Sequence, residues 1–270
     1  MQSDAIKGMA RTLAVKLLPP ILKEMLKQTL RRFESAQLSI ARRDIEADSY
    51  IAWLCRVVGG WLSVNDGNIV AFSYAITSMP RSGAIVEVGS FLGLSTNILA
   101  YLADKHGRDN PFFSVDPWVF EETENRVGGY FDASKGEFRE YVKEVFKMNS
   151  SVFSDHRKPY AFEGFSSKFF ELWWAEATVT DVFGRAIKLG GPISFAYVDG
   201  AHTYEGIRGD FLAVDRYLLP GGFILFDDTG YGSPFQCRNL MPEIMANPAY
   251  ECILKRPNYL FRKKESEQRT

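Results

Sequence analysis

Three aspartates and a histidine in the C-terminal third of the chain are spaced so that they could act together. Asp199 follows the apolar run 194–198, and Asp227 and Asp228 follow a second apolar run, 223–226. If the two runs are adjacent parallel strands, their carboxyl ends lie about 4.8 Å apart. Ligands of open α/β sheets bind just outside those ends. The sequence therefore predicts that the three carboxylates converge on one crevice.

Three carboxylates this close repel one another strongly. At about 4 Å and an effective dielectric constant near 20, each pair costs about 4 kcal/mol. Either the pKa values rise or a cation binds among them. Oxygen ligands favour a hard divalent ion, Mg²⁺ first and Mn²⁺ or Ca²⁺ as alternatives. The other interpretation is that one or two of these aspartates cap helices or bind backbone amides.

His202 lies three residues after Asp199, just beyond the same strand end. An imidazole with an ordinary pKa near 6.5 can accept a proton at neutral pH. A divalent ion lowers the pKa of a coordinated hydroxyl. We therefore expect His202 to act as the base that removes the proton of such a hydroxyl.

A glycine-containing turn marks a second place where a ligand could bind. Residues 84–96, AIVEVGSFLGLST, form an apolar run, a turn and the start of an apolar helical pattern. This is typical of the first strand–turn–helix unit of a doubly wound α/β sheet. Gly89 allows a sharp turn, and Gly93 is expected to let a ligand approach the helix closely.

Glu87 distinguishes this turn from the dinucleotide pattern. It stands two residues before Gly89, where the pattern G-x-G-x-x-G has its first glycine. A carboxylate there would repel a diphosphate and suits a ligand with an ammonium group. The form E-x-G-x-x-x-G resembles the class I methyltransferases that use S-adenosylmethionine (SAM). A glycine turn in an unrelated α/β protein is the alternative interpretation.

Two further strand ends carry candidate ligand contacts. Residues 111–116 predict a second strand with Asp116 at its end, where a carboxylate can bind ribose hydroxyls of SAM or NAD. Trp118 either stacks on adenine or is packed in the core. A short strand, 160–163, leads to Gly164 and Ser166. The aromatic residues that follow are interpreted as core: Phe165, Phe169, Phe170, Trp173 and Trp174.

Several motifs together resemble one family. V-D-G-A-H-T-Y-E-G, the downstream Asp210, L-L-P-G-G and F-D-D, within residues 84–228, resemble the metal-dependent SAM O-methyltransferases of bacterial secondary metabolism. That group includes macrolide and aminocoumarin sugar O-methyltransferases and the cephalosporin 7-hydroxylation/methylation enzyme. The resemblance implies a seven-stranded, Rossmann-like doubly wound sheet, mostly parallel with an antiparallel edge. It also implies methyl transfer from SAM to a hydroxyl of a small molecule, a sugar or a secondary metabolite.

The resemblance assigns roles to particular residues. It implies Asp199, Asp227 and Asp228 as metal ligands and His202 as the base. The SAM-binding residues expected from the resemblance and from the strand ends are Glu87, Gly89, Ser90, Gly93, Ser95, Thr96, Asp116, Trp118, Gly164, Ser166 and Asp199.

Composition limits the remaining classes. The chain has 270 residues, 46% hydrophobic and 24% charged, with a net charge of −1. This is typical of one large α/β domain with a helical extension, or of two small domains, and the charge argues against nucleic acid as the main partner. Three widely spaced cysteines suit a reducing cytoplasm. No apolar run approaches the roughly 18 residues of a membrane span, and no signal peptide is visible.

The predicted domains are a helical extension (1–80), a methyltransferase domain (81–264) and a frayed tail (265–270). Residues 1–35 are basic and amphipathic, a pattern that suits an anionic membrane surface but also packing on the domain or on a second subunit of a homo-oligomer. The long insertion after Asp116 is typical of a lid or of disorder. Two other functions stay open at this stage: an NAD-dependent oxidoreductase and a catalytically silent scaffold with the SAM fold.

Overall fold

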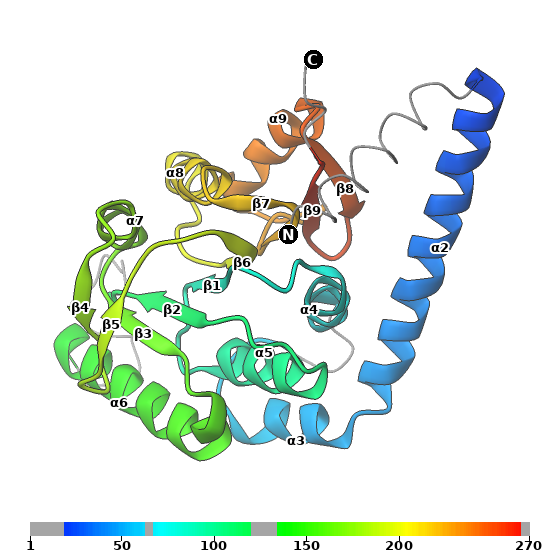
Figure 1. Ribbon diagram of the computed structural model, residues 1–270. Helices are drawn as coiled ribbons and strands as arrows, with labels where there is room; N and C mark the ends of the chain where they lie inside the picture. The colour runs from blue at the N-terminus through cyan, green and yellow to red at the C-terminus, as the bar shows by residue number, and fades with distance from the viewer. Residues whose placement is uncertain (1–18, 63–66, 120–133, 266–270) are drawn as a thin grey trace.

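The computed structural model describes residues 19–62, 67–119 and 134–265. Within these residues, seven strands form one twisted sheet in the order β3-β2-β1-β6-β7-β9-β8 (Figure 1). The first five strands in this order are parallel, and β9 and β8 complete the sheet as antiparallel neighbours. This confirms the predicted fold class. The strands are β1 (Ala84–Val88), β2 (Phe112–Asp116), β3 (Tyr160–Glu163), β6 (Ile193–Val198), β7 (Leu218–Phe226), β8 (Tyr250–Leu254) and β9 (Tyr259–Lys263).

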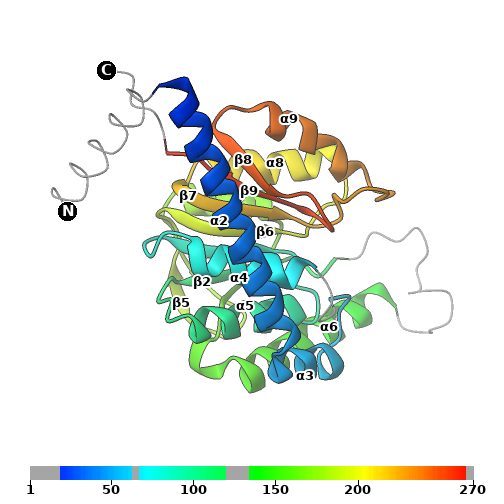
Figure 2. The same ribbon diagram turned by 90° about the vertical axis from the view of Figure 1, so that its right-hand side faces the viewer.

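Helices cover both faces of the sheet (Figures 1 and 2). One face carries α2 (Pro20–Glu46), α3 (Ser49–Val57), α4 (Gly67–Ser78) and α5 (Leu94–Lys105). The other carries α7 (Ser166–Trp174), α8 (Tyr204–Asp215), the 3₁₀ turn η2 (Gln236–Leu240) and α9 (Met241–Ala246). Helix α6 (Lys135–Phe153) continues into the short turn η1 (Asp155–Arg157) and packs on α5. A separate hairpin pairs β4 (Thr178–Thr180) with β5 (Ala186–Lys188).

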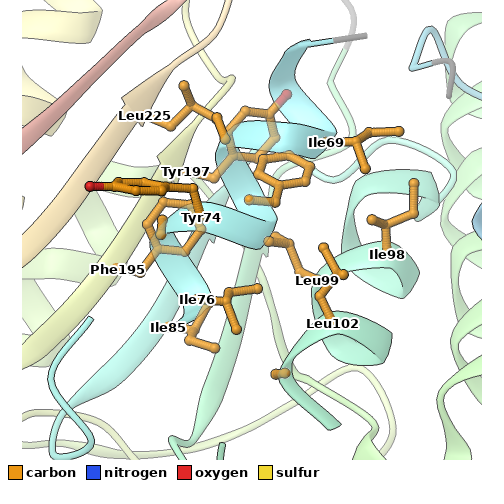
Figure 3. Close-up of a cluster of buried hydrophobic side chains, with 14 of the residues drawn as sticks. Ile69, Tyr74, Ile76, Ile85, Ile98, Leu99, Leu102, Phe195, Tyr197 and Leu225 are labelled. Atoms are coloured by element: carbon orange, nitrogen blue, oxygen red, sulfur yellow. The ribbon is translucent and has the colours of Figure 1, made fainter. Parts of the chain in front are cut away.

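The two cores follow from the alternation of side chains along each strand. Ile85 points to the face covered by α4 and α5, and its neighbour Val86 points to the opposite core. Figure 3 shows the first core, where Ile85, Phe195 and Tyr197 of the sheet meet α4 and α5. Helix α4 is apolar all round and is buried along most of its length. The predicted extension therefore contributes a helix to the core of the sheet.

Two details of the expected elements are wrong. The strand predicted from the apolar run 223–226 begins earlier, because α8 ends at Asp215 and β7 starts at Leu218. The reason is that Leu218 pairs with Ile193 at the start of β6. The aromatic group after β3 is also only partly core. Phe169, Phe170 and Trp173 are buried, whereas Phe165 is 58% and Trp174 is 61% exposed.

The basic N-terminal segment falls partly outside the described residues, which begin at residue 19. Helix α2 starts at Pro20, where proline is tolerated in the first turn. It is tied to the sheet by an ion pair of 2.5 Å between Arg262 Nη2 in β9 and Glu34 Oε1. Within the described residues, every helix is too short or too polar to cross a bilayer. The predicted membrane contact and the predicted homo-oligomer stay predictions. The insertion after Asp116 is predicted to be a lid or disordered, and its residues 120–133 lie outside the described residues.

Candidate active site

The strand order places a topological switch point between β1 and β6. From β1 the chain continues outward on one side to β2 and β3, and later returns to the other side as β6 and β7. In open α/β sheets, ligands bind outside the carboxyl ends of the strands at such a point. The turn after β1 and the turn after β6 lie there together, because the Asp199 N–H donates to the Val88 carbonyl at 2.8 Å.

Gly89 makes this close packing of the two turns possible. Its φ is +85°, a left-handed conformation that favours glycine. A Cβ on Gly89 would overlap the carbonyl oxygen of Asp199. The predicted need for a sharp glycine turn is confirmed, and its physical reason is the backbone of the neighbouring strand end.

A group of side chains of the types that can bind a metal converges beside this turn. One donor atom from each of Asp199, His202 and Asp228 lies within 4.8 Å of the other two. His202 Nε2 is 3.2 Å from Asp228 Oδ2, and the His202 ring lies 4.4 Å from the exposed ring of Phe235. Asp228 adopts a left-handed φ of +55°, which aspartate tolerates better than most residues. The predicted convergence is therefore present for Asp199, His202 and Asp228.

Asp227 has a different environment from the one predicted for a metal ligand. Its Oδ1 accepts from Asn68 Nδ2 at 2.8 Å, from the Asp228 N–H at 2.9 Å and from Asn258 Nδ2. Its Oδ2 accepts from the Tyr197 hydroxyl at 2.6 Å. Both oxygens thus accept hydrogen bonds from donors of the protein itself. Within the described residues, the metal-capable group contains Asp228 and not Asp227.

The Tyr197 hydroxyl lies between the carboxylates of Asp199 and Asp227. It is 2.6 Å from Asp227 Oδ2 and 3.1 Å from Asp199 Oδ2. One hydroxyl has a single proton to donate, and the shorter contact identifies Asp227 as its acceptor. Burial, reinforced by the charge of Asp227, raises the pKa of Asp199 well above its ordinary value. Positive charge at this position would therefore stabilise the ionised form of Asp199.

Asp116 holds the glycine turn in place. Its Oδ2 accepts from the N–H groups of Ser90 at 2.8 Å and Phe91 at 2.9 Å, and its Oδ1 accepts from the Trp118 N–H at 2.6 Å. The Gly164 N–H in turn donates to the Asp116 carbonyl at 3.1 Å. Asp116 as a whole remains partly exposed at the strand end. The predicted ribose contact stays a prediction, and the carboxylate has a structural role beside it.

Glu87 lies under the turn and not at its surface. It is 0% exposed, and its Oε2 accepts from Thr96 Oγ1 at 2.5 Å and Ser114 Oγ at 3.0 Å. Within the described part of the chain, its Oε1 has no hydrogen-bond partner. Burial raises the pKa of Glu87 to about 7, although the surrounding hydroxyls favour the ionised form. In this arrangement Glu87 joins β1, β2 and the start of α5, and its predicted contact with an ammonium group stays a prediction.

Other predicted SAM contacts are also buried. A Cβ on Gly93 would come within 3.2 Å of the Phe146 ring, so α6 is a close neighbour there. The Trp118 ring packs against the Phe146 ring, with 5.2 Å between the ring centroids. Its Nε1–H donates to the Phe91 carbonyl at 3.0 Å. The core interpretation of Trp118 is therefore the one that holds. The predicted contacts that have little or no exposed surface are Glu87, Ser90, Gly93, Ser95, Thr96 and Trp118.

The remaining predicted contacts reach the surface along the strand ends. Gly89, Asp116, Gly164, Ser166 and Asp199 are partly exposed. The Ser166 side chain hydrogen-bonds to the buried Asp210 of α8, whose pKa burial raises to about 6. Ser166 thereby links the start of α7 to α8.

Three residues near the aspartates were missed by the sequence reasoning. Asn68 at the start of α4 and Asn258 between β8 and β9 carry no local signal, because their contacts are far away in the sequence. Tyr197, by contrast, does have a local signal in the sequence. It stands two residues before Asp199, and alternate residues of a strand share a face.

Comparison with known proteins identifies the class. The family model described as a methyltransferase domain matches residues 86–229, which is more than half of the chain. The chain belongs to this family and is a SAM-dependent methyltransferase. The two alternatives, an NAD-dependent oxidoreductase and a silent scaffold, are thereby set aside. No curated protein sequence matches the chain.

Solved structures of O-methyltransferases are similar to the chain. The O-methyltransferase NovP is 16% identical, with 74% of this chain and 80% of that chain covered and a TM-score of 0.49. CalS11, a TDP-rhamnose 3′-O-methyltransferase of calicheamicin biosynthesis, is 16% identical, with 74% and 78% covered and a TM-score of 0.46. An O-methyltransferase from Bacillus cereus in complex with S-adenosylhomocysteine is 13% identical, with 85% and 91% covered and a TM-score of 0.45.

Proposed function

We propose that this methyltransferase transfers the methyl group of SAM to a hydroxyl of a small molecule, with a divalent cation at the ends of β6 and β7. The observation that carries the proposal is the group formed by Asp199, His202 and Asp228, whose donor atoms lie within 4.8 Å of one another. This group directly adjoins the glycine turn, through the contact of Gly89 with Asp199.

The donor set fits a divalent cation. Two carboxylates supply hard oxygen ligands for Mg²⁺, Mn²⁺ or Ca²⁺. Burial and the neighbouring Asp227 disfavour the charged form of Asp199, so a bound cation would stabilise the ionised carboxylate. Asp199 and Asp228 would hold the ion. When bound, the ion would supply Lewis acidity that lowers the pKa of the acceptor hydroxyl.

His202 is the proposed base. Its Nε2 lies 3.2 Å from Asp228 Oδ2, so an Nε2–H donating to this carboxylate leaves Nδ1 as the atom that accepts the proton. In the reaction the O–H bond and the S–CH₃ bond of SAM break and an O–CH₃ bond forms. The proton goes to His202, and S-adenosylhomocysteine leaves. Phe235 packs on the imidazole and limits its orientation.

The SAM site is proposed along the ends of β1, β2, β3 and β6. The partly exposed predicted residues there are Gly89, Asp116, Gly164, Ser166 and Asp199. Phe165, between two of them and 58% exposed, adds an apolar surface. The residues buried beneath them, Glu87 among them, hold the turn and α5 in position.

The test compares two histidines. His202→Gln should reduce methyl transfer to a panel of hydroxyl acceptors about 10²- to 10⁴-fold, the usual contribution of a general base. Binding of Mn²⁺ and S-adenosylhomocysteine should persist. His156 is the matched control, because it also pairs with a carboxylate, Asp104 Oδ2 at 3.5 Å, on the surface. His156→Gln should leave the rate unchanged.

Other outcomes would count against the proposal. A full rate in His202→Gln would exclude the imidazole as the base. A loss of Mn²⁺ affinity in this variant would instead make His202 a metal ligand. Methyl transfer that is unaffected by EDTA would contradict the proposal that a divalent cation takes part in the reaction.

A further inference from the structure

Asp227 is held by side chains that lie before and after the matched methyltransferase segment in the sequence. Asn68 belongs to α4, before the matched methyltransferase segment 86–229, and Asn258 lies after that segment, between β8 and β9. Both donate to Asp227 Oδ1. The carboxylate is thus fixed by elements outside the part of the chain that defines the family.

Asn258 uses its amide on both sides. Its Oδ1 accepts from the N–H groups of Thr229 and Gly230, each at 3.0 Å. Its Nδ2 donates to Asp227 Oδ1 and, at 3.2 Å, to Asn68 Oδ1. One side chain therefore spans the whole turn after β7, and only an amide supplies acceptor and donor together at this size.

Two glycines allow the loop between β8 and β9, which contains Pro257 and Asn258, to lie close to the turn after β7. A Cβ on Gly230 would overlap the Pro257 carbonyl, and a Cβ on Gly67 would overlap the Pro257 ring. Pro257 is thus in contact with the turn after β7 on one side and with the start of α4 on the other. The position of Asn258 follows directly from that of its neighbour.

We propose that Asn68 and Asn258 are positioning residues of the cation site. They hold Asp227 as a partly buried carboxylate, and Asp227 Oδ1 in turn accepts the N–H of Asp228 at 2.9 Å. This fixes Asp228 in its left-handed conformation and directs its carboxylate to His202 and Asp199. The inference rests on the proposed function.

The test measures Mn²⁺ affinity by electron paramagnetic resonance, independently of activity. Asn258→Asp keeps the acceptor for Thr229 and Gly230 but turns the donor into an oxygen that faces Asp227. Loss of such a supporting contact typically weakens metal affinity about 10- to 100-fold, and we expect this here. Asn68→Ser, which is too short to reach Asp227, should also weaken it. Affinity for S-adenosylhomocysteine, measured on the same samples, should stay within about twofold and reports an intact fold.

Asn247→Asp is the matched control, since Asn247 Oδ1 accepts from the Ala249 N–H at 3.0 Å and aspartate retains that bond. It should bind Mn²⁺ as the unchanged protein does. Equal weakening in this control would reduce the effect to added charge and overturn the inference. Unchanged affinity in both Asn258→Asp and Asn68→Ser would overturn it as well and leave the proposed function standing. An unchanged protein that binds no Mn²⁺ would instead refute the proposed cation, and the inference with it.

Discussion

Replacement of Glu87 by glutamine should change how stability depends on pH. Glu87 is fully buried, and burial raises its pKa from 4.5 to about 7. A pKa difference of one unit corresponds to about 1.4 kcal/mol, so this group alone makes the free energy of unfolding depend on pH by about 3 kcal/mol. The glutamine side chain has nearly the same shape and does not ionise.

The direction follows from proton binding. Between the unfolded pKa near 4.5 and the folded pKa near 7, the folded protein binds more protons at this site than the unfolded chain. Stability therefore falls as the pH rises through this window and becomes constant above it. The free energy of unfolding of Glu87→Gln, relative to that of the unchanged protein, should therefore rise by about 3 kcal/mol between pH 4.5 and pH 8.

Urea unfolding at several pH values between 4.5 and 8 measures this difference. Glu176→Gln is the control, because Glu176 is an exposed carboxylate whose Oε2 lies 3.1 Å from Lys188 Nζ. It should show little pH-dependent difference from the unchanged protein. A difference between Glu87→Gln and the unchanged protein that is constant with pH, or that shrinks as the pH rises, would refute the reasoning about the buried carboxyl.

Three further predictions concern the turns at the strand ends. Tyr197→Phe removes the 2.6 Å hydrogen bond to Asp227 and should lower the free energy of unfolding by about 1.5–3 kcal/mol, measured by urea denaturation. Gly89→Ala places a Cβ against the Asp199 carbonyl in a left-handed conformation that already costs about 1–2 kcal/mol. It should lower the melting temperature and SAM affinity, and normal calorimetry and binding would contradict it. Phe165→Ala should change stability by at most about 0.5 kcal/mol because the ring is exposed, while it weakens SAM binding in titration calorimetry.

The sequence allowed much of the fold to be predicted, because its signals are local. Apolar runs that end in Gly89, Asp116 and Asp199 mark parallel strands, and the carboxyl ends of such strands must meet at one edge. The antiparallel edge and the strand count came from the family resemblance. The hairpin of β4 and β5 was missed, since strands of three residues carry little pattern.

The candidate site could be predicted only in part. Position after a strand indicated that Asp199, His202 and Asp228 would meet, but not that Asp227, one residue earlier, would turn to other partners. That outcome depends on Asn68 and Asn258, which are remote in the sequence. For Trp118, the sequence left stacking on adenine and packing in the core both open, and the contact with Phe146 of α6 decides for the core.

The most direct measurement of the central claim is a crystal structure with Mn²⁺ and S-adenosylhomocysteine, read from the anomalous scattering of manganese. We expect a manganese peak between the carboxylates of Asp199 and Asp228, with His202 beside it and Asp227 still bonded to Asn258. No peak at the ends of β6 and β7, or a peak that is coordinated by Asp227 in place of Asp228, would contradict the account.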